Sequence, residues 1–137
     1  MKERLQTTDH LARIGVCESS LCLICGLELE DHNHLFFDCQ YSRNVLERLK
    51  SWVGIGGRTT NVQGITKWIM RCGASKFQKQ VMLTVISAAV YKIWWTRNMV
   101  IWQQHVLCAE NSTNFVQRNV VERVYSILPN KVSKACR

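Results

Sequence analysis

Three cysteines and one histidine lie within 18 residues of one another, at spacings that a single metal ion can bring together. Cys22 and Cys25 form a C-x2-C pair, and His34 and Cys39 form an H-x4-C pair after it. A C-x2-C turn can direct two thiolates at one ion, and Gly26 directly after the turn tolerates the positive φ that such a turn often requires. Four ligands of this kind are typical of tetrahedral Zn²⁺. The spacing therefore predicts a structural zinc site around which the N-terminal part folds.

The second ligand pair is less regular than the first. On an ideal α-helix five residues advance about 500°, so His34 and Cys39 would lie about 140° apart. We therefore expect a helix to end before Cys39 and the next one to begin near Ser42. His32 is an alternative to His34 as the nitrogen ligand, with an H-x6-C spacing. A redox role for the C-x2-C pair is a further interpretation, but it leaves the other two residues without a function.

Three of the remaining cysteines lack a Cys or His neighbour at ligand spacing. Cys17 lies five residues before Cys22 and could act as a ligand only after rearrangement. We interpret them as small buried thiols: Cys17, Cys72, Cys108 and Cys136. Cysteine mixed with histidine is typical of reducing compartments, and the N-terminus has no apolar segment of a secretory signal. The longest apolar stretch, residues 81–95, contains Lys92 and is too short to span a membrane. These features predict an intracellular protein, nuclear or cytoplasmic, without a membrane partner.

Three runs of sequence carry a resemblance to a known family: TDHLARIG at residues 8–15, CLICG at 22–26 and EDHNHLFFDC at 30–39. Together they resemble the zinc-binding domain at the C-terminal end of plant LINE-type (non-LTR) retrotransposon reverse transcriptases, over residues 5–55. The ligands in that family follow C-x2-C-x8-H-x4-C around a His-Leu-Phe core. The resemblance thus implies a structural Zn²⁺ held by four residues of this chain: Cys22, Cys25, His34 and Cys39. It also favours His34 over His32.

The resemblance implies an accessory module without catalysis of its own. A polymerase palm needs paired aspartates, but this chain has no Asp-Asp pair, and its three aspartates all lie in the first 38 residues. The carboxylate sets of the endonuclease and of ribonuclease H are missing as well. Gln40 stands where family members often carry Pro. The chain therefore looks like a detached C-terminal fragment of a reverse transcriptase that acts on no small-molecule substrate.

Apolar residues at helical spacing predict a mainly α fold. We expect a small zinc-stabilised N-terminal lobe with short helices, followed by a helical hairpin that includes one long helix and is packed by Trp68, Trp94 and Trp102. The glycines at residues 54–57 suggest a boundary between a zinc-binding domain at 5–55 and a basic helical tail at 60–137. Helices are expected at these positions: 8–15, 42–53, 61–72, 76–107 and 113–128.

Charge differs sharply between the two halves. Residues 1–56 carry six basic and eight acidic side chains, whereas residues 57–137 carry twelve basic side chains and only Glu110 and Glu122 as acids. An excess of this size is more than solubility requires and favours RNA or single-stranded DNA as a partner. The candidate phosphate contacts are basic residues of the second half: Lys67, Arg71, Lys76, Lys79, Lys92, Arg97, Arg118 and Arg123.

An alternative interpretation treats the tryptophans as core and the lysines as an ordinary solvated face. On that hypothesis the chain is a structural or interaction module, or a degenerate relic of a retroelement. Zinc then only holds the N-terminal lobe together, and an exposed apolar face docks to another protein or to a second copy of the chain. Salt-dependent binding to RNA separates the two hypotheses.

Overall fold

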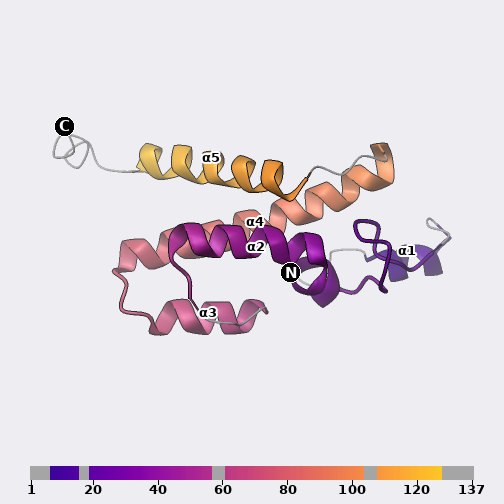
Figure 1. Cartoon of the computed structure of the whole chain (residues 1–137), viewed down its shortest axis with the longest axis horizontal. Helices are drawn as coiled ribbons and strands as arrows, with labels where there is room; N and C mark the ends of the chain where they lie inside the picture. Colours follow the sequence, from indigo (N-terminus) through magenta and orange to yellow (C-terminus); the bar gives the residue numbers. More distant parts are fainter. Residues whose placement is uncertain (1–6, 16–18, 57–60, 104–107, 128–137) are drawn as a thin grey trace.

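The fold is a bundle of helices with an irregular N-terminal lobe at one end (Figure 1). The computed structural model describes residues 7–15, 19–56, 61–103 and 108–127. Its elements are α1 (Thr8–Arg13), a π-helical turn η2 (His34–Asp38), α2 (Gln40–Val53), α3 (Val62–Arg71), α4 (Lys76–Gln103) and α5 (Ala109–Ile127). In these ranges the only pairing of extended backbone is one antiparallel bridge, between Leu21 and Leu29. The expected mainly α fold is confirmed.

Three helices pack against one another in pairs to form the bundle: α2, α4 and α5. The long helix α4 and α5 form the expected hairpin, with α5 running back along α4, and α3 lies against α4 (Figure 1). The buried residues at the contacts of the three helices are apolar: Val45, Leu46, Leu49, Val85, Ala89, Ile93, Val116 and Val120. The helix α2 belongs to the expected zinc-binding domain but shares one core with α4 and α5. The change in charge at residues 54–57 therefore does not mark a boundary between two cores.

Local signals explain where the helices begin and end. Gly54 has a φ of 78° and ends α2 in the left-handed conformation, which glycine adopts without strain. The side chain of Asn61 accepts a hydrogen bond from the backbone N–H of Gly64 and caps α3. Ser75 and Gln78 exchange side-chain to backbone hydrogen bonds of 3.2 and 2.9 Å, a capping box at the start of α4.

The last helix begins earlier than its apolar pattern predicts, at Ala109 rather than Thr113. Its first turns are buried through polar residues, since Ser112 and Thr113 are almost fully covered. The hydroxyl of Tyr41 in α2 contacts both Ser112 Oγ and Thr96 Oγ1 of α4. A search for apolar periodicity therefore misses this contact of the three helices.

Two of the three tryptophans expected in the hairpin, Trp68 and Trp94, are partly buried against the core. The side chain of Trp102 lies outside the described residues, as do positions 104–107 and 128 at the expected helix ends. Within the described ranges, no helix combines the length and the hydropathy needed to cross a membrane.

Candidate metal centre

The structure brings the predicted ligand residues Cys22, Cys25, His34 and Cys39 together in one cluster, with all four ligand atoms within 4.8 Å of one another. The two Sγ atoms of Cys22 and Cys39 are 4.0 Å apart, and Cys25 Sγ lies 3.3 Å from His34 Nε2. Tetrahedral Zn²⁺ with ordinary bond lengths places two sulfurs about 3.8 Å apart and a sulfur and a nitrogen about 3.5 Å apart. The donor set and its spacing therefore fit a single zinc ion.

The first ligand pair lies in a tight turn. Gly26 has a φ of 67°, and its N–H donates to the carbonyl of Cys22 at 2.8 Å. The N–H of Cys22 donates in turn to the carbonyl of Glu28 at 2.7 Å, and the bridge between Leu21 and Leu29 closes the loop. Backbone hydrogen bonds of the loop itself thus fix the turn that carries both thiol groups.

The second ligand pair uses a π-helical turn instead of an α-helix. The N–H of Cys39 donates to the carbonyl of His34, five residues earlier, at 2.6 Å. This wider turn brings residues five apart closer in angle than the ideal α-helix does. Cys39 itself has left the helical conformation, with φ −58° and ψ 133°, and α2 begins at Gln40, two residues before the expected Ser42.

The ring of His34 has a defined orientation. Its Nε2 faces Cys25, whereas its Nδ1 lies 3.4 Å from a carboxylate oxygen of Glu28, longer than an ordinary hydrogen bond. A carboxylate behind a ligating imidazole is a common way to fix the ring and to raise its basicity. The carboxylate of Asp31 accepts a hydrogen bond of 2.7 Å from the N–H of His34 and fixes the start of the turn. The spacing of the ligands gives no indication of Glu28.

Hydrogen bonds around the thiols favour a thiolate on one of them. Cys22 Sγ donates to Cys39 Sγ, which raises the pKa of Cys22 and lowers that of Cys39. Burial opposes the lower pKa of Cys39, but the backbone amides of Tyr41 and Ser42 at the start of α2 lower it further. A thiolate held by backbone amides at a helix N-terminus is suited to bind a cation.

Replacing His34 by alanine is expected to abolish tight metal binding, whereas replacing His32 leaves it intact. The reason is that the Nε2 atom of His34 belongs to the cluster and His32 does not. Titration of each variant with Co²⁺, which reports tetrahedral thiolate ligation by its visible spectrum, measures the difference. Equal retention of metal by both variants would refute His34 as the nitrogen ligand.

Six of the eight candidate phosphate contacts reach the surface. Lys67, Arg71, Lys76, Arg118 and Arg123 are exposed, and Lys79 is partly exposed. The ammonium group of Lys79 donates to the carbonyl of Met70 at the end of α3, at 3.0 Å. These residues form two groups, one where α3 meets the start of α4 and one on α5 (Figure 1).

The interpretation of Lys92 and Arg97 as phosphate contacts is wrong for this structure, because both are buried. Lys92 Nζ lies 3.9 Å from the ring centroids of both Trp95 and Phe115, and burial lowers the pKa of this ammonium group. Arg97 forms a buried ion pair with Glu30, with Nη2 2.8 Å from the carboxylate. Both cations therefore serve contacts inside the protein.

The remaining cysteines differ from one another. Cys72 is partly buried, and its thiol donates to the carbonyl of Ile69 at 3.0 Å. Cys108 is exposed, so the expectation of a buried thiol is wrong there. Cys17 and Cys136 lie outside the described residues.

Comparison with known proteins gives one family. Residues 1–45 match the model of a family described as zinc-binding in reverse transcriptase. No curated protein matches the chain, and no solved structure does. The matched segment contains all four residues of the cluster, so the comparison supports a reverse-transcriptase zinc-binding domain in this part of the chain.

Proposed function

We propose that this chain is a non-catalytic accessory module derived from a retroelement reverse transcriptase of the plant LINE type, and that its basic helices bind RNA or single-stranded DNA. The observation that carries the proposal is the Cys3His cluster inside the segment that matches the reverse-transcriptase family. Four protein ligands leave no open position on a tetrahedral ion, so zinc is structural here.

Charge supports a role for the second half of the chain in binding. Three thiolates and a neutral imidazole around a dication carry a formal charge of about −1, which makes the acidic N-terminal half more negative still. The exposed cations of α3, α4 and α5 are accompanied by only two acidic residues in positions 57–137. Phosphate is therefore attracted to the helices of the second half and repelled, on average, by the N-terminal half with its metal site.

Binding to a labelled single-stranded RNA is expected to weaken steeply as salt increases, by about 0.7 in log affinity per log unit of salt for each phosphate contacted. The double variant Lys67→Gln/Arg71→Gln, on one face of α3, should lower that slope by about 1.4. Fluorescence anisotropy over a salt series measures both values. The full chain is needed, because α2 shares the core with α4 and α5.

The double variant Arg43→Gln/Arg48→Gln serves as a control with the same change in charge, on the exposed side of α2. It should leave the slope close to that of the wild type. An equal loss in this variant would place binding on the N-terminal half, and binding without salt dependence would contradict the proposal.

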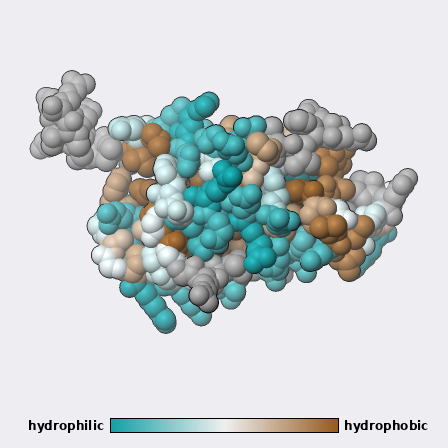
Figure 2. Space-filling view, in the orientation of Figure 1, coloured by the Kyte–Doolittle hydropathy of each residue, from teal (hydrophilic) through white to brown (hydrophobic). Residues whose placement is uncertain are grey.

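Exposed leucines on the N-terminal lobe favour a second candidate function, that of a module that docks to another protein or to its own copy. Leu27 and Leu29 are 77% and 66% exposed, and Ile14 is 56% exposed. Figure 2 shows hydrophobic residues at the end of the molecule that carries this lobe, whereas hydrophilic residues predominate over the middle of the face shown. Apolar side chains gathered on so small a lobe are typical of a protein interface.

A further inference from the structure

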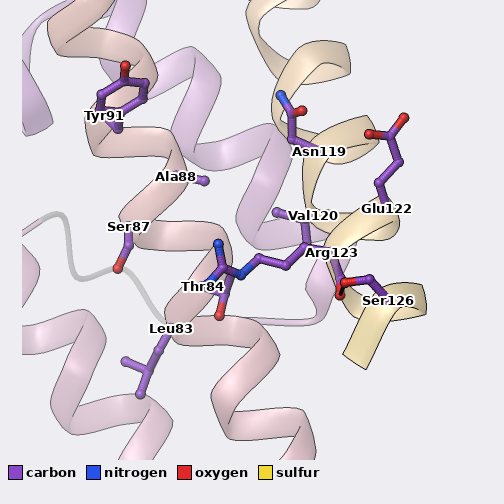
Figure 3. Close-up of a pocket in the computed structure, with 10 residues that line it drawn as sticks. All are labelled: Leu83, Thr84, Ser87, Ala88, Tyr91, Asn119, Val120, Glu122, Arg123 and Ser126. Atoms are coloured by element: carbon purple, nitrogen blue, oxygen red, sulfur yellow. Dashed lines mark hydrogen bonds between the residues drawn. The ribbon is translucent and has the colours of Figure 1, made fainter. Parts of the chain in front are cut away.

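A groove lies between α4 and α5, with a volume of about 860 Å³ (Figure 3). This volume is within the range of about 300–1,000 Å³ of clefts that bind small organic groups. Apolar Ala88 and Val120 belong to its lining, and the other groups that matter here are Ser87 and Tyr91 from α4 and Asn119 and Arg123 from α5. The groove therefore combines an apolar surface with polar groups from both helices.

The two largest polar side chains of the groove come from opposite helices. Tyr91 is 60% exposed, and its ring packs beside that of Trp94 with the centroids 6.2 Å apart. Arg123 is exposed and extends from α5 across the groove toward Thr84 of α4 (Figure 3). Within the described ranges its guanidinium group forms no ion pair. An accessible aromatic ring and an accessible planar cation thus line the same groove, about two helical turns apart along α4.

The acidic group at the groove does not neutralise this cation. Glu122 is the acidic residue of the lining, and Figure 3 shows its carboxylate directed away from α4. The hydroxyl of Thr84 donates to the carbonyl of Gln80 in its own helix at 2.8 Å. The amide nitrogen of Asn119 donates to the carbonyl of Phe115 in its own helix at 3.0 Å. The hydroxyl of Ser87 and the amide oxygen of Asn119 remain at the groove as further polar groups.

We propose that this groove binds a short segment of a single-stranded nucleic acid, with one base stacked on Tyr91 and a phosphate of the same strand paired with Arg123. Base stacking on an aromatic side chain is tolerant of sequence, and a guanidinium group binds phosphate through two parallel hydrogen bonds. Ser87 and Asn119 offer hydrogen bonds to the sugar or to the edge of the base. The proposal rests on the proposed function and identifies where on the helices the strand is held.

The test uses the full-length, zinc-loaded protein with labelled oligoribonucleotides and oligodeoxyribonucleotides. Tyr91→Ala and Arg123→Gln are each expected to raise Kd about tenfold, whereas Tyr91→Phe keeps the stacking ring and should bind nearly as well as the wild type. Ser87→Glu adds a negative charge to an exposed position of the groove and should also weaken binding about tenfold. Thermal unfolding of each variant verifies that it is folded.

Two variants remove the same kinds of group outside the groove. Tyr125→Ala removes a tyrosine of α5 that is 72% exposed, and Arg43→Gln removes an exposed arginine of α2. Both should change Kd by less than about threefold, since neither residue lines the groove.

The outcomes separate this proposal from the proposed function. If the wild type binds neither oligonucleotide, the proposed function fails and the groove assignment fails with it. If the wild type binds in a salt-dependent manner but Tyr91→Ala, Arg123→Gln and Ser87→Glu behave like the two controls, only the groove assignment is overturned. That second result is also the one expected if the groove instead receives a helix of a protein partner.

Discussion

Adding a chelator to the zinc-loaded protein is expected to unfold the N-terminal lobe, the part of the chain before α2. The midpoint temperature of its thermal unfolding should fall by more than about 10 °C. The lobe is too small to fold on its apolar core alone, and Cys22 and Cys39 are almost fully buried at its centre. The effect should also reach the bundle, because α2 begins directly after Cys39 and packs against α4 and α5. Far-UV circular dichroism measures the loss of helix, and tryptophan fluorescence measures the effect on the bundle, because all five tryptophans lie in residues 52–102.

Single cysteine variants make the same test without a chelator. Cys39→Ser should reproduce the loss of metal and of stability, because its sulfur is one of the four atoms of the cluster. Cys108→Ser is the matched control, since Cys108 is exposed and lies outside the cluster. If the chelator leaves the unfolding temperature unchanged, zinc does not stabilise this fold.

The cluster could be predicted from sequence because its determinants are local. Cys22 and Cys25 lie in one turn, and the glycine after them adopts the positive φ that was expected. The end of the helix before Cys39 also follows from the 3.6-residue repeat of the α-helix, which places His34 and Cys39 about 140° apart. The repeat does not indicate that a π-helical turn brings the two side chains together. The π-helical turn depends on the burial of Leu35, Phe36 and Phe37 against the bundle, which a pattern of ligands does not contain.

The helices and the hairpin of α4 and α5 could be predicted from apolar periodicity, whereas the contacts of α2 with that hairpin could not. The position of α2 beside α4 and α5 depends on tertiary packing, and charge alone suggested a division at residues 54–57. The same limitation explains the error at Lys92 and Arg97: their charge suggests surface positions, because charged side chains usually lie there. The partner of Arg97 is 67 positions away in sequence, so no local pattern indicates it.

Replacing Glu30 by glutamine is expected to destabilise the zinc-loaded protein by about 3–5 kcal/mol, because it removes the buried carboxylate charge that pairs with the buried guanidinium group of Arg97. Glu30 and Arg97 are 1% and 2% exposed, and the carboxylate accepts hydrogen bonds of 3.0 and 2.8 Å from Nε and Nη2. Urea unfolding at constant free zinc measures the change. Arg97→Met should cost a similar amount, since it leaves the carboxylate buried.

The double variant Glu30→Gln/Arg97→Met should lose less stability than the two single variants together, because it removes both buried charges. Glu47→Gln is the comparison at a more accessible carboxylate: Glu47 is 66% exposed and lies 3.4 Å from Nζ of Lys50, which is itself buried, so its loss should cost less than the loss of Glu30.

Glu30 also lies in the metal loop, where its N–H donates to the carbonyl of Ser20 at 3.0 Å. Because the side chain of Glu30 ties this loop to α4, its replacement should also weaken zinc binding, measured by competition with a chromophoric chelator, whereas Glu47→Gln should not. A Glu30→Gln protein as stable as Glu47→Gln, with unchanged zinc affinity, would show that this ion pair does not join the metal lobe to α4.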